Sequence, residues 1–152
     1  NYATGTNIMP FSEKLGTFLR SAKIKGKVFN NYDIGSYLIF FLYPQQLTFV
    51  DNRPEAFSAK FFEETYYPML IEDLAWQKNF QKYQFQWIIF QRHDQTEHGQ
   101  PFLIRRIKDP QWIPVYVDDY SIVLARNSAQ NANFIKKNAL SNDIFKFKKA
   151  SH

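Results

Sequence analysis

The feature that most constrains the fold is the run from Phe85 to Phe90, which reads Phe-Gln-Trp-Ile-Ile-Phe. Apart from one Gln, it consists of aromatic and β-branched residues, which favour strands. Because successive side chains of a strand point to opposite faces, such a run needs apolar cover on both sides. We therefore expect a central strand in a layered sheet.

Further strands and helices are expected to alternate along the chain. Four other segments have strand character, at 27–30, 46–51, 112–117 and 121–126. Apolar residues at helical spacing predict helices after Pro10, at 34–43, 55–67 and 71–83, and after Pro101 and Ser128. Alternation of this kind favours parallel strands joined by right-handed crossovers, whereas the short connection at 118–120 predicts an antiparallel hairpin.

The fold class predicted is therefore α/β. We expect three layers, with a mixed and mostly parallel sheet of about five strands, helices on both faces and a C-terminal antiparallel hairpin. The 152 residues include 16 Phe, 9 Tyr and 3 Trp, which is enough apolar surface for one ring-rich core. No repeat or internal break is visible, so we predict a linker at 1–9, a single α/β domain at 10–145 and a basic tail at 146–152.

Composition excludes several kinds of chemistry. The chain has no cysteine, so disulfides, Cys-ligated zinc and thiol nucleophiles are excluded. It also lacks a Gly-x-Ser-x-Gly pattern, and we assign no catalytic residue. His93 to His98 contains four potential metal ligands, but their spacing is not that of a zinc motif, and we expect a solvated loop. No metal and no other cofactor is expected.

The formal net charge of +5 is a mild excess. A solvated surface is the default interpretation, and contact with an anionic membrane surface is the alternative. The basic groups lie at 105–108, 136–137 and 146–149, too dispersed along the sequence for us to expect nucleic-acid binding. No apolar run reaches the roughly 20 residues needed to cross a bilayer. Because the chain begins without Met, we expect it to be a fragment whose membrane segments lie elsewhere.

The most informative stretch runs from Val28 to Phe57. Its pattern consists of Asn30 or Asn31, Tyr32, Gly35, Tyr37 and Leu38, followed by Phe49, Asp51, Arg53 and Phe57. Downstream lie the strand at 85–90 and the hairpin residues Trp112, Val115, Tyr116, Asp118, Asp119 and 123–126. In combination these residues resemble the soluble C-terminal domain of bacterial polytopic membrane proteins of the dolichyl-phosphate-mannose-protein mannosyltransferase-like (GT-C) type. Ser36 and Asn52 stand where that pattern has glycine, and Phe57 stands where it has tyrosine.

The resemblance implies in which compartment the domain lies and which partners it contacts. Such proteins are membrane-embedded glycosyltransferases that use lipid-phosphate-linked sugars, and their catalytic carboxylates belong to loops of the membrane part. It therefore implies a non-catalytic extracytoplasmic domain, on the periplasmic or cell-surface face, anchored through segments absent from this chain. The implied partners are the transmembrane portion of the same polypeptide and a glycan or lipid-phosphate sugar. The parent protein, rather than this fragment, is then the transferase.

Polar and aromatic residues that follow the first two expected strands are the candidate ligand-binding residues: Asn31, Tyr32, Asp33, Tyr37, Asp51 and Arg53. Open α/β sheets bind ligands beyond the carboxyl ends of their strands, where we expect Asn31, Asp51 and Arg53 to converge. The structural alternative is a buried Asp51–Arg53 ion pair that ties two loops together. Asp118 and Asp119 are interpreted as turn residues rather than paired catalytic carboxylates.

Two other functions stay open at this point. A stand-alone module that binds glycans or small anions would use Tyr32, Asp33, Asp51 and Arg53. A small α/β enzyme is the third hypothesis.

Overall fold

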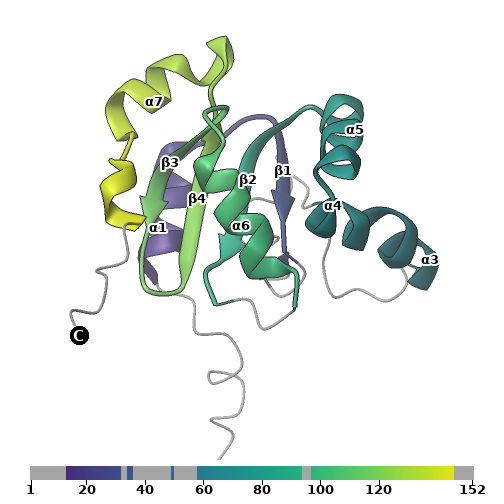
Figure 1. The fold of residues 1–152 in the computed structure, drawn as a ribbon. Coiled ribbons are helices and arrows are strands. Elements are labelled where there is room, and N and C mark those ends of the chain that lie inside the picture. The colour runs from purple at the N-terminus through teal and green to yellow at the C-terminus, as the bar shows by residue number, and fades with distance from the viewer. Residues whose placement is uncertain (1–12, 32–33, 36–48, 50–57, 94–96, 146–152) are drawn as a thin grey trace, which may run out of the picture.

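Four strands form one mixed sheet at the centre of the molecule, in the order β1-β2-β4-β3 (Figure 1). The computed structural model describes residues 13–31, 34–35, 49, 58–93 and 97–145. Its elements are α1 (Glu13–Ala22), β1 (Lys27–Asn30), α3 (Ala59–Phe61), the π-helix η3 (Phe62–Tyr66), α4 (Tyr67–Ile71), α5 (Asp73–Tyr83), β2 (Phe85–Gln91), α6 (Gly99–Lys108), β3 (Trp112–Val117), β4 (Ser121–Arg126), η4 (Ala129–Asn131), α7 (Ala132–Asn138) and η5 (Asn142–Phe145). No helix in these ranges has the length and apolar character needed to cross a bilayer.

The α/β class and the mixed sheet are confirmed, but the predicted dominance of parallel strands is not matched among the four described strands. β1 pairs with β2 in parallel, whereas the β2–β4 and β3–β4 pairs are antiparallel. The reason is that β4, which a short turn joins to β3, pairs with β2 and so extends the hairpin into the sheet. The expected strand at 46–51 lies outside the described residues except for Phe49. The hairpin has the predicted bounds but is followed by α7 and η5, so it does not close the fold.

Helices cover both faces of the sheet, as the sequence of β2 requires. Ile88 and Phe90 belong to a ring-rich core that includes residues of α4, α5 and α6. Trp87 and Ile89 belong to a second core with residues of α1, against which α7 packs. Figure 1 shows α6 in front of the sheet and α1 behind it. The central strand is therefore buried from both sides.

Gln86 interrupts the alternation of side chains along β2. Phe85 and Trp87 pair with the consecutive residues Lys27 and Val28, which leaves Gln86 as the extra residue of a β-bulge. Its Oε1 atom accepts hydrogen bonds from Ser128 Oγ at 2.9 Å and from Asn131 Nδ2 at 3.3 Å. Since Gln86 and Asn131 are buried, this network ties the region before α7 firmly to the sheet.

Gly26→Ala is expected to lower the free energy of unfolding by about 2 kcal/mol. Gly26 has a φ of +103°, which side chains disfavour, and an added Cβ would lie 2.5 Å from Cγ of Gln86. The substitution would therefore displace the side chain that holds the bulge network. Urea unfolding followed by circular dichroism measures the loss. Lys25→Ala, at the exposed neighbouring position, is the control and is expected to change stability little. Equal stability of the two variants would contradict the role given to this turn.

The helical stretch from Ala59 to Ile71 passes through Pro68, where the sequence predicted an interruption. In a regular α-helix the proline ring clashes with the carbonyl four residues earlier. Here a π-helical turn comes before it, with Tyr67 N donating to the Phe62 carbonyl, and the wider turn accommodates the ring. The break comes instead at Glu72, whose backbone is extended, and α5 begins at Asp73.

The free edge of β3 is partly covered by the chain that follows α7. Leu140 N donates a hydrogen bond to the Pro114 carbonyl at 2.8 Å. Pro114 is suited to an edge strand because it has no backbone N–H to pair. In Figure 1 the yellow C-terminal segment runs beside β3. This cover limits the pairing of the edge with other chains.

Candidate functional site

Polar residues gather where β1 and β2 end and β4 begins, and we call this region the carboxyl edge. It comprises Asn30, Asn31, Gln91, Arg92 and Ser121. Asn30 closes β1, Gln91 closes β2, and Ser121, the first residue of β4, is the cross-strand partner of Gln91. This is the end of the parallel pair at which open α/β sheets bind ligands.

Asn31 lies at this edge, where the sequence placed it. It is buried, and its Oδ1 accepts a hydrogen bond from Gln91 N at 3.1 Å. The neighbouring Asn30 is also buried, and its Oδ1 accepts from Phe49 N at 2.8 Å. The two amides therefore join the end of β1 to the end of β2 and to Phe49. The other five predicted ligand-binding residues, Tyr32, Asp33, Tyr37, Asp51 and Arg53, lie outside the described residues, and their convergence stays a prediction.

Asp118 organises the turn between β3 and β4, which confirms its interpretation as a turn residue. Its Oδ1 accepts hydrogen bonds from the backbone N–H groups of Tyr120 and Ser121, both at 2.8 Å. Its Oδ2 accepts from the Tyr116 hydroxyl at 2.5 Å. Arg92 reaches this turn from β2, because its Nη1 donates to the Asp118 carbonyl at 2.7 Å. The turn is thereby held against the carboxyl edge.

Two buried polar atoms at the edge have no hydrogen-bond partner among the described residues. They are Oγ of Ser121 and Oε1 of Gln91. Cross-strand partners in an antiparallel pair point to the same face of the sheet, so the two side chains are neighbours. Sequence analysis did not single them out, because their juxtaposition depends on the β2–β4 register.

Ser121→Ala is expected to raise the free energy of unfolding by about 1 kcal/mol, since it removes a buried hydroxyl that lacks a partner. Thermal and urea unfolding measure the change. Ser128→Ala is the matched control: it removes a hydroxyl that donates to Gln86 and is expected to cost about 1 kcal/mol. A loss of stability in Ser121→Ala would show instead that the hydroxyl is satisfied by a bound water or ligand.

The helix expected after Pro101 begins two residues before it, because α6 starts at Gly99. Glu97 and His98 lie 3.8 Å apart between Oε2 and Nε2, and residues 94–96 lie outside the described residues. In the described ranges, no three His, Asp or Glu side chains are grouped so that they could hold a metal ion.

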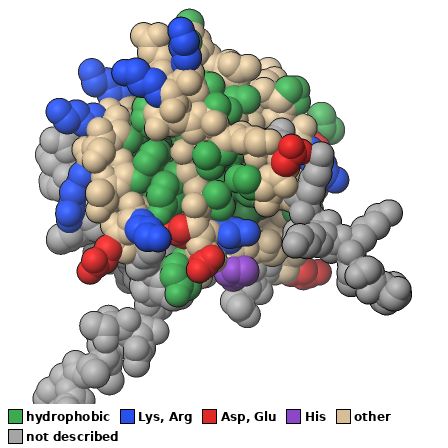
Figure 2. All heavy atoms as spheres, turned by 90° about the vertical axis from the view of Figure 1, so that its left-hand side faces the viewer, with side chains coloured by type: hydrophobic (Ala, Val, Ile, Leu, Met, Phe, Trp, Pro, Cys, Tyr) green, Lys and Arg blue, Asp and Glu red, His purple; other side chains and the backbone are tan. Residues whose placement is uncertain are grey.

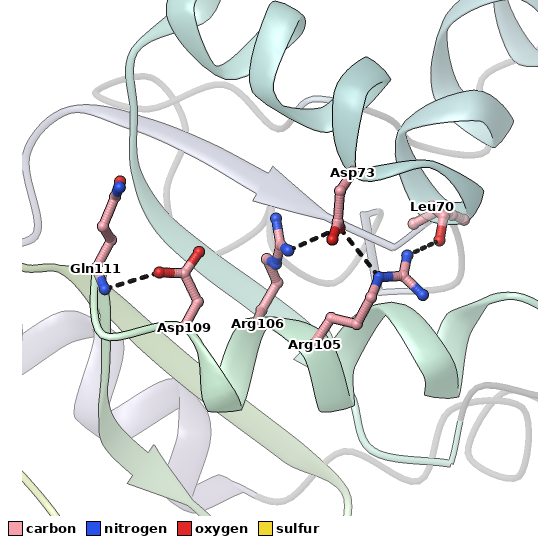
Figure 3. Close-up of polar contacts among 6 residues, drawn as sticks. All are labelled: Leu70, Asp73, Arg105, Arg106, Asp109 and Gln111. Carbon is pink, nitrogen blue, oxygen red and sulfur yellow. Dashed lines mark hydrogen bonds and ion pairs between the residues drawn. The ribbon is translucent and has the colours of Figure 1, made fainter.

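A second polar cluster joins α5 to α6 (Figure 3). Arg106 has a side chain only 4 % exposed, and its Nη2 lies 2.9 Å from Oδ1 of Asp73. Its guanidinium carbon lies over the Trp76 ring at 5.2 Å and near the Phe102 ring at 5.5 Å. Arg105 also reaches Asp73, with Nε 3.1 Å from the same oxygen, and donates to the Leu70 carbonyl. Asp73 thus bridges two arginines.

The electrostatics of this cluster are set mainly by burial. Removal from water lowers the pKa of Arg106 from its ordinary value, and the charge of Asp73 opposes that shift. Nε and Nη1 of Arg106 have no partner in the described part of the chain. The sequence carried a signal for this burial, because Arg106 follows Phe102 by one helical turn and so shares the apolar face of α6.

This cluster corrects one expectation about the basic groups. A solvated surface was the default interpretation for Arg105, Arg106 and Lys108, and contact with anionic headgroups was the alternative. The structure engages both arginines with Asp73, and only Lys108 of that group is exposed.

Comparisons with models of protein families, with curated proteins and with solved structures find no match to this chain. From its fold and its polar residues, the described part of the chain is an α/β domain with a polar carboxyl edge.

Proposed function

We propose that this chain is a non-catalytic extracytoplasmic domain of a membrane-embedded glycosyltransferase-like protein, and that its carboxyl edge contributes to binding the acceptor glycan or the lipid-linked sugar. The proposal rests on the resemblance of its motifs to that class and on the way in which the described motif residues are joined.

The observation that carries the proposal is the meeting of two distant motifs at the carboxyl edge. Asn31, from the first motif, hydrogen-bonds to Gln91 at the end of β2. The next residue, Arg92, hydrogen-bonds to the Asp118 carbonyl and, through its own backbone N–H, to the Tyr120 carbonyl of the hairpin. Residues about ninety positions apart in the pattern are therefore linked by hydrogen bonds through the end of β2. This link supports treating the two motifs as parts of one pattern.

The chemistry of the edge favours recognition. Asn30, Asn31 and Ser121 are buried, so we expect the half-buried Gln91 and Arg92 to be the groups that hydrogen-bond with sugar hydroxyls. Asp118 accepts hydrogen bonds from two backbone amides and a tyrosine hydroxyl, so it is engaged in holding the turn. These contacts support a positioning role for Asp118 rather than proton transfer.

The membrane setting is tested on the gene. The coding sequence around this chain is expected to contain several apolar segments of about 20 residues, each able to span a bilayer. A gene that encodes none of them would overturn the proposal. If such a gene product still bound sugars, the stand-alone binding module would replace it.

The non-catalytic role is tested with Asp51→Asn and Arg53→Gln in the intact protein. Sugar transfer at saturating substrate is expected to keep its kcat, while the KM for acceptor or lipid-linked sugar rises. A large fall in kcat, with expression and melting temperature unchanged, would contradict the proposal.

Ligand binding is tested on the 152-residue chain by titration with polyprenyl phosphate and with simple sugars. Backbone amide resonances of Asn31 and Gln91 are expected to shift in NMR spectra. Asn31→Ala is expected to weaken binding, whereas Asn133→Ala, at an exposed position of α7, is expected to leave it unchanged. Spectra that do not respond to any of these compounds would count against the edge as a binding site.

A further inference from the structure

The basic residues that are dispersed in the sequence gather on one layer of the fold. Residues 13–26 and 129–145, which form α1, the turn into β1, and α7 with its flanking turns, contain six Lys or Arg and two Asp or Glu. Residues 58–84 and 97–111, which form the helices of the other layer and the turns beside them, contain six of each. One layer is therefore strongly basic, and the opposite layer is electrically balanced.

We infer that the outer surface of α1 and α7 is a docking surface for an anionic phospholipid bilayer. We call it the basic face and define it by Lys14, Lys23, Lys25, Lys136 and Lys137. The inference deepens the proposed function, because it names the side of the domain that rests against the membrane.

α1 and α7 pack against the same core on one side of the sheet and contact each other through aromatic rings. The Phe18 ring of α1 contacts the Phe134 ring of α7, with centroids 6.0 Å apart. At one end, Gln130 Nε2 donates to the Lys25 carbonyl at 3.1 Å. In Figure 2 several basic side chains lie along the upper and left-hand margins of this face, and others lie lower, among the acidic side chains.

The charges on this face are available to a partner. All five defining lysines are exposed, and none of them forms an ion pair with a described residue. By contrast, Arg105 and Arg106 on the other layer are engaged with Asp73. Each basic residue near an anionic headgroup layer strengthens binding about fivefold, and the effects of several residues multiply.

A bilayer fits this surface better than a nucleic acid does. Proteins that hold single strands stack bases on exposed aromatic rings. The rings of this layer are half-buried and pack on one another instead, because Phe18 contacts Tyr116 and Phe134 contacts Trp87. A headgroup layer requires only exposed positive charge, which the five lysines on α1, the turn after it and α7 provide.

The test is sedimentation of the 152-residue chain with vesicles at low salt. Binding is expected to vesicles of phosphatidylcholine with 30 % phosphatidylglycerol and not to pure phosphatidylcholine, and it should weaken as salt rises. The triple variant Lys25→Gln, Lys136→Gln, Lys137→Gln is expected to bind about a hundredfold more weakly. The matched control, Lys60→Gln, Lys78→Gln, Lys108→Gln, removes the same charge from exposed positions of the other layer and is expected to bind nearly as well as the parent chain.

Three results would overturn the inference: no binding to the anionic vesicles, equal weakening by the two triple variants, or binding to duplex or single-stranded nucleic acid but not to vesicles. Circular dichroism checks that both variants are folded. These outcomes are independent of the gene structure, so failure here is distinguishable from failure of the proposed function.

Discussion

Phe29→Ala is expected to lower the free energy of unfolding by about 4 kcal/mol. Phe29 is fully buried in β1 and belongs to the core shared with α4, α5 and α6. The rings within 6.4 Å of its centroid are those of Phe49, Tyr66, Trp76, Phe85, Phe90 and Phe102. Truncation therefore leaves a cavity walled by large rings, which have few ways to collapse into it.

The loss is large against the whole stability of such a domain, which is typically 5–15 kcal/mol. Urea unfolding measures it, and near-ultraviolet circular dichroism reports whether the surrounding rings loosen. Phe29→Leu is the control and should cost about 1.5 kcal/mol at most, because it keeps most of the apolar volume. If the two variants were equally stable, the ring would not be the link between β1 and the helices.

The strands were predictable because each is marked by its own residues. The run at 85–90 favours a buried strand because it is apolar and β-prone. The strands at 112–117 and 121–126 are marked by the turn between them, in which the Asp118 side chain accepts hydrogen bonds from the backbone. Those signals are local. The antiparallel pairing of β2 with β4 was not predictable, because no residue near Ser121 indicates that it will lie opposite Gln91. The predicted sheet was mostly parallel and the described sheet is not, because strand pairing depends on contacts between residues far apart in the sequence.

The candidate site divides in the same way. Asn31 was predictable, because a polar residue directly after a buried strand marks the strand's end. Gln91 and Ser121 were not, because only the β2–β4 pairing makes them neighbours. The basic face was missed for a related reason: Lys25 and Lys136 are distant in the sequence, and their shared surface exists only once α1 and α7 lie on the same side of the sheet. The passage of a helix through Pro68 depends on a π-helical turn, which no residue pattern around Pro68 indicates.

Asp73→Ala is expected to destabilise the protein by about 3 kcal/mol, which is more than an exposed carboxylate usually contributes. Asp73 is 57 % exposed, but its partner Arg106 is only 4 % exposed. Removing Asp73 leaves the buried guanidinium without its counter-charge, and the cost arises from that uncompensated charge.

A double-mutant cycle separates this cause from the other roles of Asp73 in the first turn of α5. Arg106→Met keeps an apolar stem beside Trp76 and removes a charge whose Nε and Nη1 lack partners among the described residues. Alone it is expected to change stability by less than about 1 kcal/mol. In that background Asp73→Ala is expected to cost only about 1 kcal/mol, the share left to Arg105 and the helix terminus. The coupling of about 2 kcal/mol should persist in 0.5 M salt, because a buried charge is screened little. A cycle without coupling would mean that another group neutralises the charge of Arg106. A bound anion or water would then be sought at Nε and Nη1 of Arg106.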